Sequence, residues 1–405
     1  MTPPDLNTCA ASAEEVLACV RQLCSPLATE RVPLAEALGR MLREPVLAPE
    51  DQPAFDRSAV DGFAVRLDDP GDSFHIVDEI HAGDWRPRAL QPGETVCIAT
   101  GGALPGEGLQ VVMKEDARLD GSTVCILSRT PARNIRFRGE DCLAGQVLVE
   151  AGEVLQPGTL GLLASAGHTQ PLVTRLPAVL HLATGDEIVS PEQTPQPGQI
   201  RDSNSTLVRA FFQSLRIVPE QLRVGEDEAG IERAFKANAH KADLVLISGG
   251  ASVGEHDSTR RVLERHGFTI HVSKTATRPG KPLIVAQRER VIAFGLPGNP
   301  LAHFVCLNLF VRAALERFAG LPARSPFHRG LLATDLEAGG GERETFWPAV
   351  WRLEKTSVAL TPLPWTSSGD LTSLALANAL IRVPGGTASL PARSEVECSF
   401  TSSPS

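Results

Sequence analysis

The stretch Leu244-Val245-Leu246-Ile247-Ser248-Gly249-Gly250 is an apolar run of strand length that ends at two glycines. A short loop follows, and Asp257 stands where a helix is expected to begin. This order predicts a βα unit of an open α/β sheet. Backbone N–H groups and carboxylates then meet at the end of one strand, a layout that suits a phosphate-bearing ligand.

Two later loops have related chemistry. The loop Thr277–Pro282 presents Arg278 and Lys281 and is held stiff by prolines. The loop Gly295–Pro300 follows the apolar run Val291–Phe294 and precedes a long helix. Ligands of open α/β sheets bind outside the carboxyl ends of the strands. We therefore expect the glycine loops after residues 248 and 294 to border the same crevice.

Length and composition set the class of protein. A chain of 405 residues is expected to form two to four domains, and 42% hydrophobic with 21% charged residues is typical of a globular protein. The net charge of -9 argues against general affinity for nucleic acid, because an acidic surface repels the phosphate backbone. Any anionic ligand must be met by local cations.

The cysteines and the apolar segments indicate a cytoplasmic protein. The eight cysteines form no CxxC pair and have no histidine at metal-ligand spacing, so we expect reduced, mostly buried thiols. The N-terminus lacks a signal-peptide pattern. The apolar helix candidate Leu301–Leu315 contains polar residues and is shorter than the ~20 residues of a membrane span, so no membrane insertion is expected.

Periodicity predicts a multidomain fold of α/β plus β class. Residues 1–50 and 142–176 read as a helical N-terminal module, with helices over 12–24, opened by Ser12 and Glu15, over Leu34–Leu42 and over Thr159–Ala166. Residues 51–141 contain short strands and turns, typical of an inserted β-rich domain. Strands and helices alternate over 177–325, which predicts a central, doubly wound α/β domain. Residues 326–405 predict a C-terminal β barrel.

Five acids at strand ends or turns could take part in chemistry: Asp61, Asp141, Glu187, Asp227 and Asp257. Mg²⁺ binds oxygen ligands and bridges substrate phosphates, so two or three of these carboxylates beside a diphosphate would suffice. Other interpretations stay open. Asp227 and Asp257 also fit helix N-caps, Asp61-Gly62 fits a turn, and Glu187 fits a solvated loop.

The cations and glycines also have two interpretations. Lys274, Arg278 and Lys281 fit either a solvated basic face or an anion site beside the glycine loops. Gly249, Gly250 and Gly298 could serve only as turns, and Pro297 and Pro300 could only start a helix. The α/β segment contains no P-loop, because Gly280-Lys281 is followed by Pro282 where that motif has Ser or Thr. It contains no GxGxxG motif either.

Taken together, the motifs resemble the MoeA family, the molybdopterin molybdenumtransferases, which include the gephyrin E domain. They occur in family order and comprise Phe55–Val65, Thr100-Gly101, Arg138–Asp141, Thr184–Glu187, Asp202-Ser203-Asn204, Ser248-Gly249-Gly250 through Asp257, Pro279–Pro282 and Leu296–Pro300. Phe63 stands where the family often has Tyr, and Arg278 where Lys is common. Ser367–Asp370 in the C-terminal domain matches less well.

The resemblance implies a homodimer of four-domain subunits, in which residues 1–50 and 142–176 form a linker and dimerisation module and the α/β domain is like that of the molybdopterin adenylyltransferases. It implies the reaction of adenylylated molybdopterin with molybdate to give molybdenum cofactor and AMP, with Mg²⁺ or a similar divalent ion. Our own interpretation of the chemistry places this ion on Glu187 and Asp257. Implied partners are a molybdopterin adenylyltransferase and cofactor-receiving molybdoenzymes or their chaperones. We also hypothesise that Asp61, Thr100 and Asp141 lie across a subunit interface from the α/β site.

The resemblance carries functional positions over to this chain. The catalytic set is Asp61, Thr100, Asp141, Glu187, Asp227, Asp257, Pro297 and Pro300. The expected ligand-binding set is Ser248, Gly249, Gly250, Ser252, Gly254, Lys274, Arg278, Gly280, Lys281, Gly298 and Asn299. Two other functions stay open: adenylyl transfer from ATP to molybdopterin, and a non-catalytic scaffold like the gephyrin E domain.

Overall fold

The structure, a computed structural model, describes residues 6, 9–225, 228–249, 253–354 and 357–402, and within this part the side chains of 253–257 are excluded. The chain divides into two compact units. One comprises Met1–Glu30 and Thr174–Ser405, and the other Arg31–Val173. The strands β1 (Thr29–Arg31) and β12 (Leu172–Thr174) lie where the chain passes between them.

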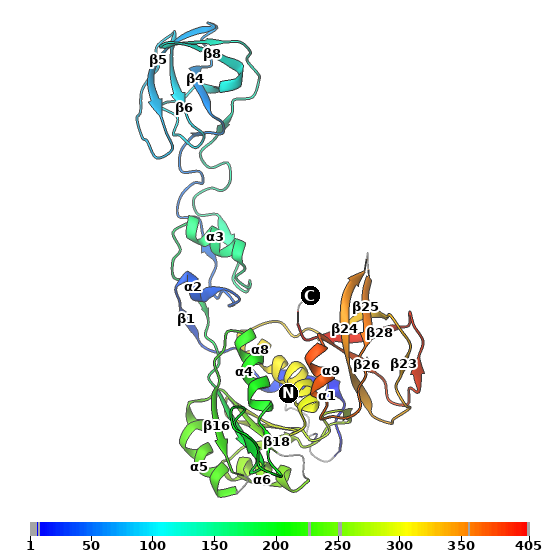
Figure 1. The fold of residues 1–405 in the computed structure, drawn as a ribbon. Coiled ribbons are helices and arrows are strands. Elements are labelled where there is room, and N and C mark those ends of the chain that lie inside the picture. The colour runs from blue at the N-terminus through cyan, green and yellow to red at the C-terminus, as the bar shows by residue number, and fades with distance from the viewer. Residues whose placement is uncertain (1–5, 7–8, 226–227, 250–252, 355–356, 403–405) are drawn as a thin grey trace. The chain divides into compact units, whose positions relative to one another are not determined.

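A six-stranded mixed sheet forms the centre of the first unit (Figure 1). Neighbouring strands follow the order β16 (Glu220–Val224), β13 (Val179–Thr184), β17 (Leu244–Ser248), β21 (Val291–Leu296), β20 (Ile284–Arg288) and β18 (Thr269–Val272). The first four pair in parallel, whereas β20 runs antiparallel to both of its neighbours. The predicted mainly parallel sheet is therefore confirmed, with one reversed strand.

Side chains of this sheet alternate between two apolar layers, as the period of two in a strand requires. On β17, Leu244 and Leu246 pack into one layer, and Val245 and Ile247 into the other. The first layer also contains residues of α1 (Ala13–Leu23), α4 (Asn204–Ser214) and α8 (Arg312–Ala319). The second contains residues of α5 (Glu228–Asn238) and α6 (Val253–Arg265). Both faces are covered at β17, so its residues Leu244–Ile247 are all apolar and buried.

The long helix predicted after the loop Gly295–Pro300 forms with one irregularity. It consists of α7 (Pro300–Cys306), a π-helical turn η3 (Leu307–Val311) and α8. The apolar residues of the π-helical turn pack into the first apolar layer, and Asn308 is buried with them and donates to the carbonyl of Phe304. The segment ends at Gly320, whose φ of 89° only glycine adopts readily.

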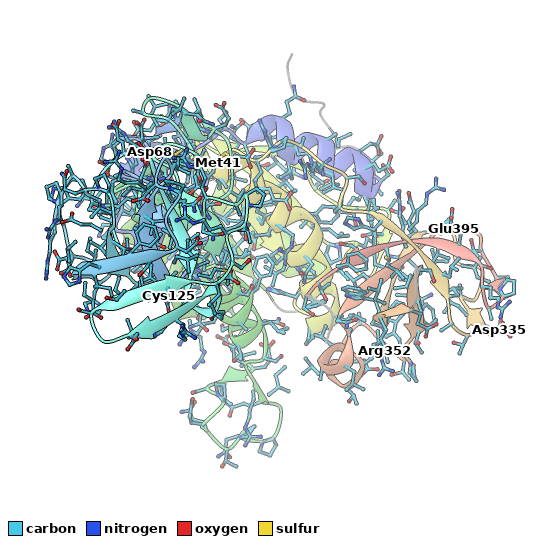
Figure 2. All side chains as sticks on the ribbon, turned by 90° about the horizontal axis from the view of Figure 1, so that it is seen from above. Met41, Asp68, Cys125, Asp335, Arg352 and Glu395 are labelled. Carbon is cyan, nitrogen blue, oxygen red and sulfur yellow. The ribbon has the colours of Figure 1, made fainter. Side chains whose placement is uncertain are left out.

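The C-terminal strands form a closed, barrel-like sheet. The order β24, β25, β22, β28, β26 closes through pairing of β26 with β24, and β19 adds in parallel to β24. Charged side chains such as Asp335, Arg352 and Glu395 lie on its outside (Figure 2). The elements here are β19 (Thr277–Arg278), β22 (His328–Leu332), β23 (Leu336–Glu337), β24 (Glu344–Glu354), β25 (Ser357–Pro362), α9 (Leu371–Leu376), β26 (Ala379–Val383), β27 (Ser389–Leu390) and β28 (Glu395–Phe400).

Arg382 on β26 joins three carboxylates from separate elements: Glu14 of α1, Glu344 of β24 and Glu397 of β28. Arg382→Met keeps the apolar stem but leaves Glu344, whose side chain is only 17% exposed, without its cation. We expect the free energy of unfolding of this unit to fall by about 2 kcal/mol. Urea unfolding followed by tryptophan fluorescence measures this loss.

Arg329→Met is the matched control, because it removes the exposed ion pair of Arg329 and Glu395 on the same barrel. We expect a loss below about 0.5 kcal/mol for this variant. Equal losses in the two variants would contradict the role of Arg382.

The second unit contains another six-stranded sheet. Its order is β7 (Leu109–Met113), β4 (Gly62–Arg66), β6 (Glu94–Ile98), β5 (Ser73–Ile80), β9 (Thr123–Ile126) and β8 (Ala117–Asp120). The remaining elements are α2 (Leu34–Ala37), β2 (Val46–Leu47), β3 (Arg57–Ser58), η1 (Lys114–Asp116), β10 (Ile135–Arg136), β11 (Val147–Val149) and α3 (Pro157–Ser165). The β-rich character predicted for 51–141 is thus confirmed.

Several expectations at the N-terminus are refined. The capping box of Ser12 and Glu15 is confirmed, but α1 packs with the mixed sheet and belongs to the first unit. The helix predicted over Leu34–Leu42 is wrong beyond Ala37: Gly39 has a φ of 78°, and Met41 and Leu42 form bridges to Val154 and Val173. The boundaries at residues 50, 141, 176 and 325 stay predictions.

The remaining expectations from composition concern thiols and membrane spans. All eight cysteines are unpaired and five of them are buried, as predicted. Across the described part of the chain, none of the helices has both the length and the apolar character needed to cross a bilayer. The remaining elements of the first unit are β14 (Ile188–Val189), β15 (Ile200–Arg201) and η2 (Ala239–Lys241).

Candidate functional site

Three neighbouring strands of the mixed sheet end at the same edge. Ala183 of β13 is in register with Ser248 of β17, and Ser248 with Leu296 of β21. The loops that follow the three strands therefore leave the sheet side by side. The expectation that the two glycine loops share one crevice is confirmed, and the loop after β13 joins them.

These loops border a cavity of about 140 Å³. Six predicted residues line it: Glu187, Ser248, Gly249, Gly298, Asn299 and Pro300. The other lining residues are Ala183, Thr184, Ile188, Ile200, Arg201, Asp202, Ser203 and Asn204. Carboxylate, hydroxyl and amide groups thus gather where the parallel strands end.

Glu187 reaches this cavity because the preceding turn contains Gly185. Gly185 has a φ of 142°, and a Cβ atom there would lie 2.7 Å from Oε2 of Glu187. A larger residue would therefore collide with the carboxylate. The half-buried Glu187 carboxylate is folded back over the end of β13 by this turn.

The loop after β21 is held from two sides. Asn204, the first residue of α4, donates from Nδ2 to the carbonyl of Gly298 at 2.6 Å. Asn299 donates from Nδ2 to Oγ of Ser368 at 2.8 Å, and the N–H of Leu301 donates to the carbonyl of Ser368. The loop is therefore tied both to α4 and to the segment that precedes α9.

Two neutral histidines lie beneath the cavity. His181 contacts Oγ of Ser248 through Nε2 at 2.7 Å, and His303 contacts the carbonyl of Pro297 through Nδ1 at 3.1 Å. Both rings are fully buried, and their centroids are 6.4 Å apart. Burial lowers the pKa of His181 to about 3, with a smaller electrostatic contribution from His303. Burial also lowers the pKa of His303, to about 4.

The cationic loop lies outside the cavity lining. Lys274, Arg278 and Lys281 are exposed, and Gly280 is buried. The guanidinium of Arg278 lies 5.0 Å from the ring centroid of Trp365, three residues before Ser368. The segment that anchors Asn299 therefore also carries the contact to Arg278, and the ligand-binding role of these four residues stays a prediction.

In the second unit, Asp61 and Thr100 are in direct contact. Asp61 precedes β4, and its Oδ1 accepts from both the N–H and the hydroxyl of Thr100 at 2.7 Å. These bonds, the backbone bond first, lower the pKa of Asp61, which stays ionised at neutral pH. Gly62 permits close strand packing, because a Cβ there would lie 2.0 Å from the carbonyl oxygen of Val112.

Asp141 has a different partner. Its Oδ1 accepts from Nη2 of Arg136 at 2.5 Å, and both side chains are about half exposed. Asp61 and Thr100 are thus hydrogen-bonded to each other, whereas Asp141, in the loop after β10, forms an ion pair with Arg136 of β10.

Several predicted positions fall outside the described part of the chain. They are Asp227, Gly250 and Ser252, together with the side chain of Asp257; Gly254 lies within α6, where only the backbone is described. Pro297 is buried and its carbonyl faces His303. The roles predicted for these residues stay predictions.

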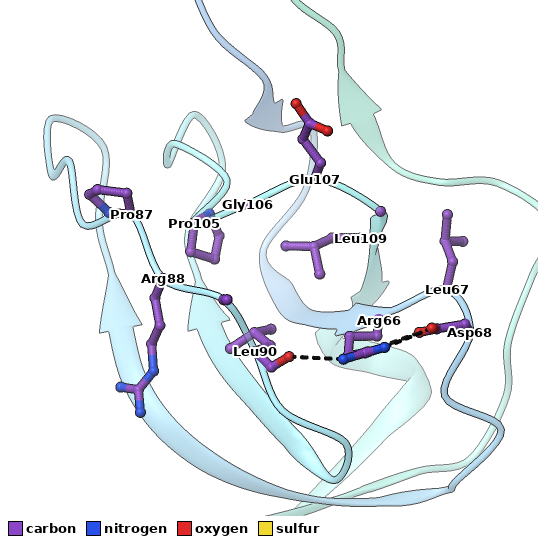
Figure 3. A pocket seen from close by; sticks show the side chains of 12 residues that line it. Arg66, Leu67, Asp68, Pro87, Arg88, Leu90, Pro105, Gly106, Glu107 and Leu109 are labelled. Atoms are coloured by element: carbon purple, nitrogen blue, oxygen red, sulfur yellow. Dashed lines mark hydrogen bonds and ion pairs between the residues drawn. The ribbon is translucent and has the colours of Figure 1, made fainter.

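A larger cavity of about 780 Å³ lies in the second unit (Figure 3). Its loops carry Arg66, which is held by Asp68 and by the carbonyl of Leu90, as well as Arg88 and Glu107. No predicted site residue lines it. The smaller cavity is the better candidate, because it lies at the carboxyl edge of the parallel strands.

Asp202 and Asn204 occur in a family motif and Ser368 in a weakly matching segment, but none of the three was assigned to the site from the sequence. Asp202 is buried and accepts from the N–H and Oγ of Ser205, the second residue of α4. The polar run 202–204 before a predicted helix was a usable signal. Ser368 had none, because its contact to Asn299 spans 69 positions.

Comparisons with known proteins cover almost the whole chain. Models of the MoeA N-terminal region (domain I and II), a probable molybdopterin binding domain and the MoeA C-terminal region (domain IV) match residues 11–167, 181–317 and 329–399. A molybdopterin molybdenumtransferase of Nostoc sp. is 35% identical over 91% of this chain and 87% of its own. The one of Bacillus subtilis is 33% identical over 89% and 86%.

Solved structures give the same result. A molybdopterin biosynthesis MoeA protein from Pyrococcus horikosii superimposes with a TM-score of 0.80 at 28% identity, covering 98% of this chain and 100% of that one.

Proposed function

The chain belongs to the MoeA family of molybdopterin molybdenumtransferases, and we propose that its cavity at the carboxyl edge of the mixed sheet binds adenylylated molybdopterin. The protein is a transferase of molybdenum cofactor biosynthesis. In this proposal it combines adenylylated molybdopterin with molybdate and releases AMP. We also propose that residues 177–325 form a doubly wound α/β domain like that of the molybdopterin adenylyltransferases.

One observation carries the assignment of the cavity. Loops after three parallel strands bring Glu187, Ser248-Gly249 and Gly298–Pro300 around a single space. Backbone N–H groups and a carboxylate at such an edge suit a ligand that contains phosphate and a bound cation. The exposed Lys274, Arg278 and Lys281 would neutralise negative charge on the leaving AMP.

The lining residues also suit a divalent ion such as Mg²⁺. Oδ1 of Asn204 is buried, and it has no hydrogen-bond partner among the described residues. Together with Glu187 it supplies the oxygen donors that Mg²⁺ prefers, and Asp257 is the further ligand we propose. Among the described residues no cluster of three or more His, Cys, Asp or Glu side chains could hold a metal, at this cavity or elsewhere, and the side chain of Asp257 lies outside that part of the chain. The ion would polarise the pyrophosphate linkage.

The chain's own residues would hold the reactants in place. Asn204 and Ser368 hold the loop of Gly298 and Asn299 by hydrogen bonds from two sides, so we expect the loop to keep its shape when the ligand binds. Fixed groups cost no reorganisation during the reaction and bring two mutually repelling anions together.

The decisive experiment measures AMP release from adenylylated molybdopterin in the presence of Mg²⁺, with and without micromolar molybdate. We expect release that depends on molybdate in the wild type and is lost in Asp257→Asn. Formation of adenylylated molybdopterin and pyrophosphate from molybdopterin and ATP would favour the adenylyltransferase alternative. No turnover by the wild type would favour a scaffold.

The hypothesis of a site shared between two subunits gives a sharper prediction. Asp61→Asn keeps the oxygen that accepts from Thr100 but removes the charge, so we expect a folded protein with at least about tenfold slower AMP release. Asp120→Asn, an exposed change on β8, is the matched control and should retain the wild-type rate.

Mixing subunits tests the shared site directly. If Asp61 acts on the partner's α/β site, a refolded mixture of Asp61→Asn and Glu187→Gln subunits contains mixed dimers with one intact site. About a quarter of the wild-type activity should then return. No recovery in a mixture that analytical ultracentrifugation shows to be dimeric would contradict a site shared between subunits.

A further inference from the structure

A chain of hydrogen bonds runs from the surface of α4 to the floor of the cavity. Nε of Arg209 donates to Oε1 of Gln221 at 2.8 Å. Nε2 of Gln221 lies 2.9 Å from the carbonyl of Ser205 and 3.0 Å from Nδ1 of His181. Nε2 of His181 lies 2.7 Å from Oγ of Ser248, which lines the cavity.

The partners fix the direction of every bond. A guanidinium only donates and a carbonyl only accepts, so Arg209 and Ser205 admit just one orientation of the Gln221 amide, with its NH₂ group toward His181. Nδ1 of His181 must then accept. The proton of the neutral ring therefore resides on Nε2, and His181 donates to Ser248.

Ser248 is left with its own proton to give. Its Oγ accepts from His181, and its carbonyl accepts from Oγ1 of Thr184 at 2.9 Å. Among the described residues, Nε2 of His181 is the one hydrogen-bond partner of Oγ of Ser248, so the hydroxyl proton has no acceptor there. Nε2 of His303 also has no hydrogen-bond partner among these residues. A hydroxyl that lines a cavity in this state can donate to a ligand.

We propose that His181, oriented by Gln221 and Arg209, is a positioning residue that makes the Ser248 hydroxyl a donor to an oxyanion of the bound substrate. This inference rests on the proposed function, because it assumes that the cavity holds substrate. The shared chemistry is a tetrahedral oxyanion, either the nucleotide phosphate or molybdate. Successive donors polarise one another, which strengthens the last bond of the chain.

The ring is suited to this task because it stays neutral. Burial keeps His181 unprotonated across the physiological range, so one tautomer persists. A protonated ring would donate from both nitrogens and would lose the bond from Gln221.

Four variants test the proposal by calorimetric titration with AMP and, separately, with sodium molybdate. Ser248→Ala and His181→Leu should each weaken binding of the same probe about tenfold, the value of one hydrogen bond of roughly 1.4 kcal/mol. His181→Gln should restore binding to within about threefold, because its amide can donate near the position of Nε2. The double variant Ser248→Ala/His181→Leu should be no weaker than either single variant, because both remove the same bond.

A matched control separates positioning from stability. Phe268→Leu opens the other apolar layer of the sheet, remote from Ser248, and should lower the melting temperature without changing affinity. Wild-type affinity in His181→Leu, or additive losses in the double variant, would contradict the proposal. The probe that loses affinity tells whether nucleotide phosphate or molybdate is bound.

A second readout does not depend on ligand or activity. Two-bond ¹H–¹⁵N correlation spectra of histidine-labelled protein, assigned with His181→Gln, should show the Nε2–H tautomer. An Nδ1–H tautomer would overturn the proposal even in an active enzyme. The Nε2–H tautomer in a protein that binds neither probe would support the hydrogen-bond direction and count against the proposed function alone.

Discussion

Replacing Glu187 by glutamine is expected to slow molybdate-dependent AMP release by at least about 100-fold. The glutamine would keep the size of the side chain but remove the negative charge that faces the cavity. That charge is the described carboxylate best placed to hold a cation beside the ligand phosphates. Quantifying AMP by chromatography under saturating substrate measures the effect.

The control for this variant lies five residues away. Glu192→Gln removes the same charge from the same connection after β13, but Glu192 is exposed and pairs with Ser190 outside the cavity. It should retain the wild-type rate. If Glu187→Gln also stayed within about threefold of the wild type, the carboxylate would have no part in the reaction.

Acid should destabilise the first unit through His181 and His303. Their pKa values of about 3 and about 4 lie below the ordinary value of 6.5, so unfolding allows both rings to bind protons that the fold excludes. Above pH 6.5 both rings are neutral in the folded and in the unfolded chain, so the lowered pKa values do not reduce the free energy of unfolding. As the pH falls from 6.5 to 5, the free energy of unfolding should drop by roughly 2 kcal/mol for each ring, or about 1.4 kcal/mol per pH unit.

The measurement is urea unfolding at several pH values, followed by the fluorescence of Trp347, Trp351 and Trp365, all of which belong to the first unit. The double variant His181→Gln/His303→Asn has no buried imidazole and should show a flatter dependence below pH 6.5. His240→Gln removes an exposed histidine and should keep the wild-type slope. Equal slopes in the wild type and the double variant would contradict the prediction.

Much of the local structure was predictable from short-range patterns. Unbroken apolar runs identified β17 and β21, because strands buried on both faces lack polar positions. The pair Ser12 and Glu15 marked the start of α1 through bonds that span three residues. Glycines after two apolar runs predicted the crevice, because parallel strands end at one edge.

Other elements depended on partners that a local pattern does not contain. The strands β16 and β20 were missed: β16 has no fully buried residue, and Gln287 and Arg288 break the apolar run of β20. The predicted helix 34–42 gave way after Ala37, because Gly39 turns the chain and Met41 and Leu42 pair with segments over 100 residues away. Pairing energy here outweighed local propensity.

By itself, the sequence determined the family motifs, the α/β alternation, the barrel-like C-terminal sheet and the edge at which the cavity lies. Only the tertiary structure decided which side chains surround the cavity and in what state. Asn204 and Ser368 reach one loop from opposite directions along the chain, and Gln221 sets the tautomer of His181 across 40 positions. The physical reason is that burial and hydrogen-bond direction are properties of several segments packed together, and no single segment carries them.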